Sequence, residues 1–163
     1  MSNNHISDFN NLNDNQKDLF TVNIIKGLVM DGVRNANSGH PGGPMSLADF
    51  TYILYSEFLT IDPKNPDWEN RDRVVLSVGH TCMLIYSILY LCGILKMDDL
   101  KNFRKFGSLT PGHPEIETPG IDASTGPLGQ GVGMGLGMAL AEKASSNSSI
   151  KRFTSILAGD GDL

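Results

Sequence analysis

Apolar side chains recur at helical spacing near the start of the chain. Between residues 16 and 39 they fall at intervals of three and four, which makes one apolar stripe along a helix. The stripe consists of Val22, Ile25, Val29, Val33 and Ala36. Gly39 predicts the end of this helix, because glycine readily takes the left-handed turn that follows one. A second helix is predicted from Pro44, since proline suits the first helical position. Its apolar face would carry Leu47, Phe50, Leu54 and Phe58.

Two short segments rich in β-branched residues predict buried strands. They are residues 73–78 (RVVLSV) and 153–158 (FTSILA), and each is followed by a glycine and then by a polar residue. Helices are predicted over residues 82–95, near 98–106 and over 132–144. Strands that alternate with helices favour an α/β fold, a parallel sheet flanked by helices. Such sheets bind ligands at the carboxyl ends of their strands.

The chain is predicted to form a single domain. Residues 1–15 are polar and rich in asparagine, and we expect them to be a flexible lead-in. Residues 16–163 would form one unit, since no internal repeat, low-complexity tract or linker interrupts them. Within this unit, residues 108–131 are dominated by Gly, Pro, Ser and Thr and predict a long loop region. Long ordered loops of this kind are usually functional.

Composition and charge narrow the classes of function. The 163 residues are 40% hydrophobic and 19% charged, as in ordinary globular proteins. Thirteen basic against 18 acidic residues give a net charge of −5, which argues against a nucleic-acid partner. The apolar run 82–95 is shorter than the about 20 residues of a membrane span, and no secretory signal opens the chain. Its two cysteines, Cys82 and Cys92, are expected to be reduced core thiols of a cytoplasmic protein.

Three histidines lie in separate loops rich in glycine and proline. His40 stands in SGHPGGP, His80 follows the strand 73–78 in SVGH, and His113 stands in TPGHP. Taken singly, His40 and His113 also fit surface turns, whereas a residue just past a parallel strand lies where ligands bind. The spacing does not match common zinc sites. We expect all three to converge on one cavity at the rim of the sheet.

The segment 124–131 (STGPLGQG) runs into further glycines at 133, 135 and 137. Glycines let backbone N–H groups approach an anion, and a helix that begins there adds its positive end. The pattern is neither a dinucleotide fingerprint nor a P-loop. Gly133 and Gly137 would alternatively serve close packing of the helix. Asp160, in Gly-Asp-Gly after the second strand, is a candidate Mg²⁺ ligand, although a plain turn also fits.

Taken together and in this order, these segments resemble the pyrophosphate-binding domain of transketolases. The resemblance rests on SGHPGGPM, RDRVVLSVGH, TPGHPE, STGPLGQG and GDG, and it runs from about Gln16 to Leu163. It implies a thiamine-diphosphate enzyme that transfers a two-carbon ketol unit from a ketose phosphate to an aldose phosphate in the pentose phosphate pathway. Such an enzyme would act as a cytoplasmic homodimer with its cofactor at the interface. Dihydroxyacetone synthase, a non-catalytic binding fragment and one half of a split enzyme are the alternatives.

The resemblance assigns roles to the three histidines. His40 would lie beside the reactive carbon of the cofactor, where it would assist proton transfer and bind the sugar hydroxyls. His80 would contact the cofactor diphosphate and face the substrate. His113 would hydrogen-bond the donor sugar. The resemblance thus makes His40 and His80 catalytic, and His40 and His113 substrate-binding.

The resemblance also assigns a cofactor and metal site. Gly126, Pro127 and Leu128 would line the thiamine diphosphate, and Gly161 would pack against its diphosphate. Asp160 would ligate the bridging Mg²⁺ or Ca²⁺. The family's asparagine metal ligand, activating glutamate and phosphate-binding arginines have no counterpart in these 163 residues. We therefore expect this chain by itself to be inactive, and poorly soluble or partly folded.

Overall fold

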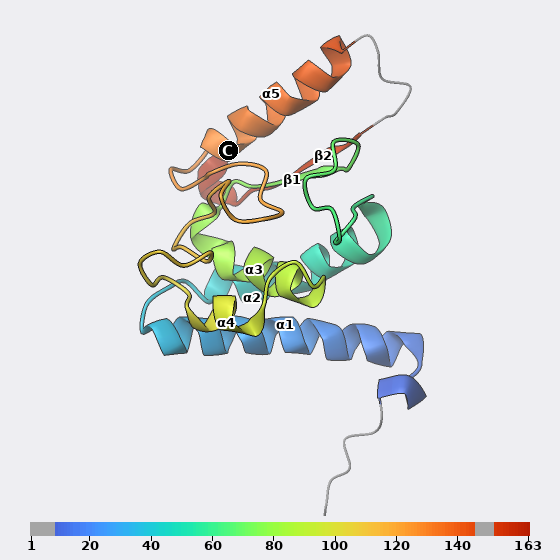
Figure 1. Ribbon diagram of the computed structural model, residues 1–163, viewed down its shortest axis with the longest axis vertical. Helices are drawn as coiled ribbons and strands as arrows, with labels where there is room; N and C mark the ends of the chain where they lie inside the picture. The colour runs from blue at the N-terminus through green and yellow to red at the C-terminus, as the bar shows by residue number, and fades with distance from the viewer. Residues whose placement is uncertain (1–8, 146–151) are drawn as a thin grey trace, which may run out of the picture.

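A two-stranded parallel sheet lies between helical layers in the computed structural model, which describes residues 9–145 and 152–163 (Figure 1). Helix α5 (Gln130–Ala144) covers one face of the sheet. Helix α3 (Cys82–Leu91) lies on the other face, with α1 (Asp14–Ala36) and α2 (Gly42–Ile53) packed against it. This arrangement confirms the predicted α/β fold with a parallel sheet.

The two strands differ in burial. Strand β1 (Arg73–Leu76) pairs in parallel with β2 (Thr154–Leu157), so that Val75 lies opposite Ile156. In β1 every residue after Arg73 is buried, whereas in β2 only Leu157 is buried. The prediction of two buried strands therefore holds for β1 and is wrong for β2. Within the described residues β2 pairs with β1 alone, which leaves its other edge open.

Helix α1 begins and ends at polar caps that differ from the prediction. It starts at Asp14, because Asn13 and Gln16 cap it reciprocally: the Gln16 N–H donates to Asn13 (2.9 Å) and the Asn13 N–H donates to Gln16 (3.0 Å). It ends at Ala36, and its cap is Asn37 in the left-handed conformation (φ 49°), two residues before the predicted Gly39, whose φ is also positive (135°). The predicted stripe is confirmed on its inner face, where Val22, Ile25 and Val29 are buried.

The apolar face predicted for α2 is partly wrong. Pro44 is not the first helical residue, since the helix begins at Gly42 and continues into a π-helical turn, η2 (Leu54–Phe58). Phe50 and Phe58 are 59% and 70% exposed, because the helix turns Ala48 and Thr51 toward α1 and α3 instead.

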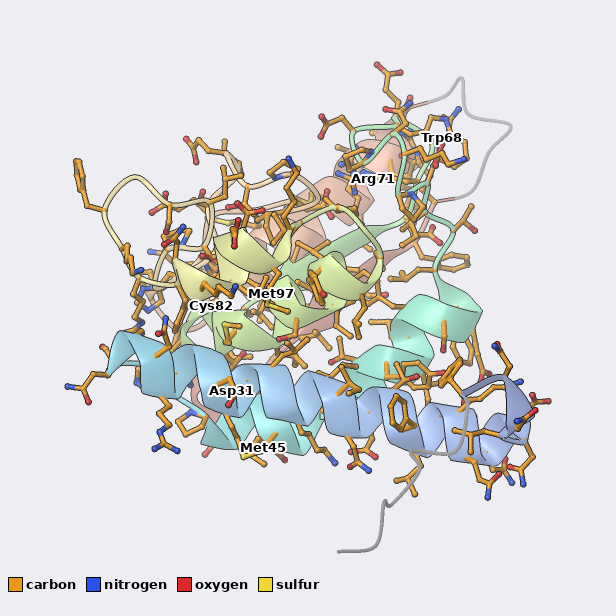
Figure 2. The ribbon with its side chains drawn as sticks, turned by 60° about the horizontal axis from the view of Figure 1, so that its bottom comes forward. Asp31, Met45, Trp68, Arg71, Cys82 and Met97 are labelled. Carbon is orange, nitrogen blue, oxygen red and sulfur yellow. The ribbon has the colours of Figure 1, made fainter. Side chains whose placement is uncertain are left out.

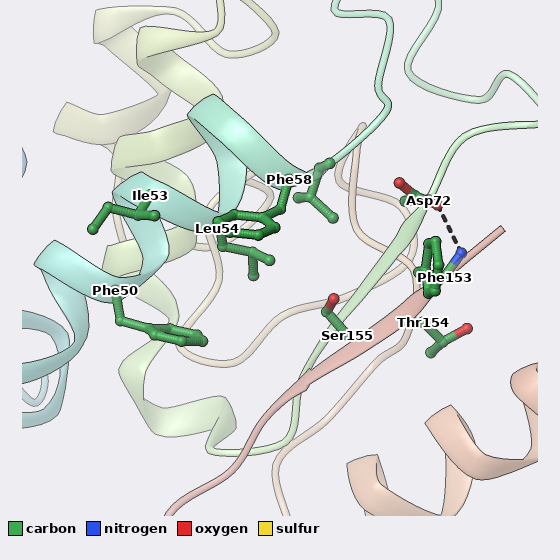
Figure 3. Close-up of a pocket in the computed structure, with 9 residues that line it drawn as sticks. Phe50, Ile53, Leu54, Phe58, Asp72, Phe153, Thr154 and Ser155 are labelled. Atoms are coloured by element: carbon green, nitrogen blue, oxygen red, sulfur yellow. Dashed lines mark hydrogen bonds between the residues drawn. The ribbon is translucent and has the colours of Figure 1, made fainter.

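The exposed phenylalanines line an apolar groove of about 430 Å³ beside the open edge of β2 (Figure 3). Asp72 lies at one end of the groove, where its carboxylate accepts a hydrogen bond from the Phe153 N–H (2.7 Å). The groove is lined by Phe50, Ile53, Leu54, Phe58, Leu59, Asp72, Phe153, Thr154 and Ser155.

Helix α3 forms the centre of the core. Its residues from Cys82 to Leu89 are all buried, and burial raises the pKa of the Cys82 thiol to about 12. Both cysteines are free, as predicted. The helix ends at Leu91, and the next helix, α4 (Met97–Lys101), is likewise shorter than predicted. None of the described helices combines the length and the apolar character needed to cross a membrane.

A buried carboxylate ties the long loop between α4 and α5 to β1. Asp122, whose side chain is 2% exposed, pairs with Arg71 at 2.7 Å and with Arg73 at 3.1 Å. It also accepts a hydrogen bond from the Val74 N–H (2.8 Å). Arg71 lies on the side of the molecule away from α1 (Figure 2). Because Asp122 engages the backbone as well as both arginines, the loop is fixed to the strand that it crosses.

The glycines of α5 divide between a packed and an open face. A Cβ atom at Gly131 would lie 2.5 Å from the Ser77 Cα, and one at Gly135 would lie 2.6 Å from the Ile156 side chain. Among the described residues, nothing lies within 4 Å of the corresponding positions at Gly133 and Gly137. The alternative interpretation, in which Gly133 and Gly137 serve close packing, is therefore not supported, and the sheet packs against Gly131 and Gly135 instead.

This division predicts opposite effects of the same substitution. Gly131→Ala should lower the free energy of unfolding by about 1–3 kcal/mol, because the added methyl group meets the backbone of β1. Gly137→Ala should raise it by about 0.5–1 kcal/mol, because alanine is the better helix former where there is room. Urea denaturation followed by circular dichroism measures both values. A destabilising Gly137→Ala would contradict the assignment of the open face.

Candidate functional site

The carboxyl ends of β1 and β2 open onto one pocket with a volume of about 320 Å³. Besides the start of α2, its lining includes the predicted site residues His80, Leu128, Asp160 and Gly161. These residues come from three segments that are far apart in the sequence, and parallel pairing brings two of those segments to the same edge of the sheet.

His80 and His40 lie side by side at this edge. His80 belongs to the short 3-10 turn η3 (Gly79–Thr81) that follows β1, and it lines the pocket. His40 precedes α2, and its exposed ring lies 5.0 Å from that of His80, centroid to centroid, with an angle of 63° between the planes. Two imidazoles in edge-to-face contact can present their nitrogens to one bound molecule.

His113 approaches the same place from the loop before α5. A Cβ atom at Gly126 would lie 3.6 Å from the His113 ring, so the two predicted site residues are in contact. The pKa of His113 is lowered, first by its loss of hydration and then by the positive charge of Arg104 and the neighbouring His80 and His40, against the opposing effect of Glu115. The structure thus brings the three histidines together, and the lowered pKa of His113 favours its neutral form.

Arg104 holds the loops of His40 and His113 together. It donates to the Ser38 hydroxyl (2.8 Å) and to the Gly112 carbonyl (3.4 Å), and each acceptor is close in sequence to one of these histidines. Its own backbone is left-handed (φ 61°), a conformation rarely taken by residues other than glycine.

Helix α3 supports the His113 loop from below. The Tyr86 hydroxyl lies within hydrogen-bonding distance of the Pro111 carbonyl (3.0 Å) and the His113 carbonyl (3.2 Å). The Cys82 thiol lies 3.1 Å from the Gly112 carbonyl. Both side chains are buried, so they give acceptors of this loop partners that water cannot reach.

The segment Gly126-Pro127-Leu128 lies against the end of β1. A Cβ atom at Gly79 would come within 3.0 Å of the Gly126 nitrogen. Pro127 is exposed, and Leu128 reaches the pocket, where a Cβ atom at Gly161 would lie 2.9 Å from its side chain. The predicted cofactor-binding residues on this segment and on the Gly-Asp-Gly turn are therefore in contact with each other.

The two aspartates of the final turn, η4 (Asp160–Asp162), differ in burial and in hydrogen bonding. Asp160 is exposed, and its carboxylate has no hydrogen-bond or ion-pair partner in the described part of the chain. Asp162 is buried and accepts hydrogen bonds from Ser77, Gly129 and Gly159. Burial raises the pKa of Asp162, but these donors outweigh it and lower the pKa overall. Only Asp160 is available to a ligand.

Sequence reasoning missed Asp162, Arg104 and Tyr86. Asp162 gave no usable signal, because Gly-x-x-Asp is not a capping box and its donors Ser77 and Gly129 are distant in the sequence. Arg104 and Tyr86 had none, since their roles depend on loops that only the fold brings near them. Among residues 9–145 and 152–163, no group of three or more His, Cys, Asp or Glu side chains forms a metal site. Among the described residues that line the pocket, the predicted metal ligand Asp160 is the one carboxylate.

Known proteins are similar to this chain in both sequence and fold. Residues 17–163 match the family described as "Transketolase, thiamine diphosphate binding domain". Transketolase 2 of Vibrio parahaemolyticus is 51% identical over 88% of this chain, and the transketolase of Halalkalibacterium halodurans is 52% identical over 87% of it. The chain spans 23% of the length of each of these two relatives.

Solved structures agree with the sequence matches. The transketolase of Campylobacter jejuni superposes with a TM-score of 0.88 at 48% identity, covering 93% of this chain and 24% of that one. A Pichia stipitis transketolase in complex with sedoheptulose 7-phosphate superposes with a TM-score of 0.85 at 44% identity, covering 90% and 23%.

The family match and the superposed transketolases place this parallel α/β fold in the thiamine-diphosphate-binding class. Within that class, the family match over residues 17–163 and the identities of about 50% show that this chain belongs to the transketolase family. It corresponds to the N-terminal domain of those enzymes.

Arg104 should control the titration of His113. Replacing Arg104 with alanine removes a nearby positive charge, so the His113 pKa should rise toward its ordinary value of 6.5. Nuclear magnetic resonance of the ring protons across a pH series measures this shift.

Lys105→Ala is the matched control, because it removes the same charge from an exposed neighbour that bonds only the Asn102 side chain. An equal pKa change in both variants would show that the effect is not local to Arg104.

Proposed function

We propose that this chain supplies the diphosphate side of the cofactor site of a transketolase. The whole enzyme would transfer a two-carbon ketol unit from a ketose phosphate to an aldose phosphate. The observation that supports this most directly is the pocket at the strand ends, where His80, Leu128, Asp160 and Gly161 meet. The homodimer, the cytoplasmic location and the role in the pentose phosphate pathway that the resemblance implies belong to the same proposal.

The chemistry of the pocket fits a metal-bound diphosphate. Mg²⁺ and Ca²⁺ take oxygen ligands, and Mg²⁺ in particular is commonly held by one or two carboxylates together with substrate phosphates and water. Asp160 offers one exposed carboxylate without a partner among the described residues. A diphosphate beside this carboxylate would be repelled unless a cation lay between them. Asp160 would therefore hold the metal, and Gly161 and the Gly126–Leu128 segment would border the cofactor.

The histidines would manage protons and sugar hydroxyls around the cofactor. Thiamine diphosphate, when bound, supplies the stabilisation of the carbanion, which leaves binding, orientation and proton transfer to the protein. His80 lines the pocket and His40 lies beside it, so both can reach a group held there. The lowered pKa of His113 favours the neutral imidazole, which can both donate to and accept from a sugar hydroxyl.

Asp160→Ala should weaken the binding of thiamine diphosphate in Mg²⁺ by at least about tenfold, since it removes the metal's protein carboxylate. Isothermal titration of a completed enzyme, in which residues 17–163 replace the matching segment of the Campylobacter jejuni transketolase, measures this with and without a chelator. Asp67→Ala is the control, because Asp67 is an exposed aspartate with no partner in the described residues. Cofactor affinity that is the same in the two variants, or that does not depend on the metal, would contradict the metal assignment.

A chimera tests the reaction itself. Residues 17–163 would replace the matching segment of the Campylobacter jejuni transketolase, to which they are 48% identical. We expect the chimera to transfer a ketol unit from xylulose 5-phosphate to ribose 5-phosphate, and His80→Ala to lower its kcat by about 10²-fold or more. The 163-residue chain by itself is expected to be inactive. An inactive chimera that still folds and dimerises would overturn the proposal, as would turnover by the chain alone that Asp160→Ala abolishes.

A further inference from the structure

The carboxylate of Asp162 joins three segments of the chain. Its Oδ1 atom accepts hydrogen bonds from the Ser77 hydroxyl (2.5 Å) and from the Gly129 N–H (2.9 Å). Its Oδ2 atom accepts one from the Gly159 N–H (2.8 Å). The Asp162 residue is 8% exposed, so water cannot easily replace these donors.

Each of the three donors adjoins residues of the proposed cofactor site. Ser77 directly follows β1 and lies two residues before the turn of His80. Gly129 closes the Gly126–Leu128 segment and precedes α5. Gly159 precedes Asp160. One buried group therefore sets the separation between the parts of the site that would meet the diphosphate, the metal and the rest of the cofactor.

The backbone at Gly129 and Gly159 leaves little freedom to replace this arrangement. The backbone of Gly129 is left-handed (φ 82°). In this conformation its N–H donates to the Asp162 carboxylate. A Cβ atom at Gly159 would lie 2.8 Å from the Val78 side chain, so this turn also packs tightly on the end of β1. Buried N–H groups that lose their acceptor are destabilised, and the segments would have to move to find another.

Asp162 is not arranged to bind the metal alongside Asp160. Its Oδ1 atom already accepts two hydrogen bonds, which fill both lone pairs, and its Oδ2 atom accepts a third. Asp160, two residues earlier, has an exposed and unpartnered carboxylate. The two aspartates thus divide the tasks of ligation and support.

We propose that Asp162 is a positioning residue, whose buried carboxylate holds the Gly-Asp-Gly turn and the Gly126–Leu128 segment in register with the end of β1. Its contribution to cofactor binding rests on the proposed function, whereas the positioning itself does not. Without the carboxylate, the turn that carries Asp160 and the loop that carries Leu128 separate from Ser77.

The test compares Asp162→Asn, Asp162→Ala and Ser77→Ala with the unchanged 163-residue chain. Amide hydrogen exchange by nuclear magnetic resonance reports directly on the two backbone donors, Gly129 and Gly159. Gly93, whose N–H donates to the Tyr90 carbonyl, is a distant reference. Asparagine keeps an acceptor for Ser77 and Gly129 but turns an N–H₂ group toward Gly159. We therefore expect Asp162→Asn to lower protection at Gly159 at least tenfold and to leave Gly129 protected. Asp162→Ala should expose both amides.

The same variants, built into the chimera with the Campylobacter jejuni transketolase and titrated with thiamine diphosphate in Mg²⁺, supply the second readout. Affinity should fall at least tenfold in Asp162→Ala and less in Asp162→Asn and Ser77→Ala, while the dependence on Mg²⁺ persists in all three. Asp67→Asn is the control for charge and should change neither measurement. If the unchanged chimera binds no cofactor, the proposed function fails, and the amide protections still decide the positioning role.

Three outcomes would overturn the proposal. The first is unchanged protection of Gly159 in Asp162→Asn. The second is loss of protection at Gly93 together with Gly129 and Gly159 in all three variants, which would show a general effect on folding. The third is loss of the Mg²⁺ dependence in Asp162→Asn, which would make Asp162 a metal ligand.

Discussion

At the end of β1, backbones from distant parts of the chain approach one another closely, and the site depends on that approach. A Cβ atom at Gly131 would lie 2.5 Å from the Ser77 Cα, and one at Gly79 would lie 2.9 Å from the Thr125 carbonyl carbon. Each contact is possible only because a side chain is absent. The missing side chains let α5 and the loop before it rest directly on the strand, which places Gly126 and Leu128 beside the turn of His80.

Hydrogen bonds from buried side chains then fix what the close packing allows. Thr125 donates its hydroxyl to the Leu76 carbonyl at 2.6 Å, and Asp162 gathers donors from both sides of the sheet's end. On the far side of the histidines, Tyr86 of the apolar helix α3 supports the backbone around His113. None of these side chains is predicted to contact the cofactor or the substrate. They hold in place the residues that are.

Burial distinguishes the carboxylate that is free to bind a ligand from the carboxylates that hold the structure together. The carboxylate that is free to bind a cation, Asp160, is exposed, whereas the buried carboxylates Asp122 and Asp162 are each surrounded by donors. Arg104 similarly lies beside His113 and disfavours its protonated form. Buried charges with complete sets of partners stabilise one geometry, and the unpaired charge is left for the ligand.

Local patterns in the sequence were enough to predict the order of helices and strands, the parallel sheet and the loops that carry His40, His80 and His113. Residue spacing and turn chemistry report on secondary structure because both act over a few neighbouring positions. They could not show that Gly131 and Gly135, rather than Gly133 and Gly137, face the sheet, since the rotation of a glycine-rich helix is set by what packs against it. Nor could they reveal Asp162, whose donors at Ser77 and Gly129 are distant in the sequence. The sequence by itself determined which residues stand at the ends of strands and in loops. Only the tertiary structure decided which of them meet, because a hydrogen bond requires two groups within about 3 Å whatever their separation along the chain.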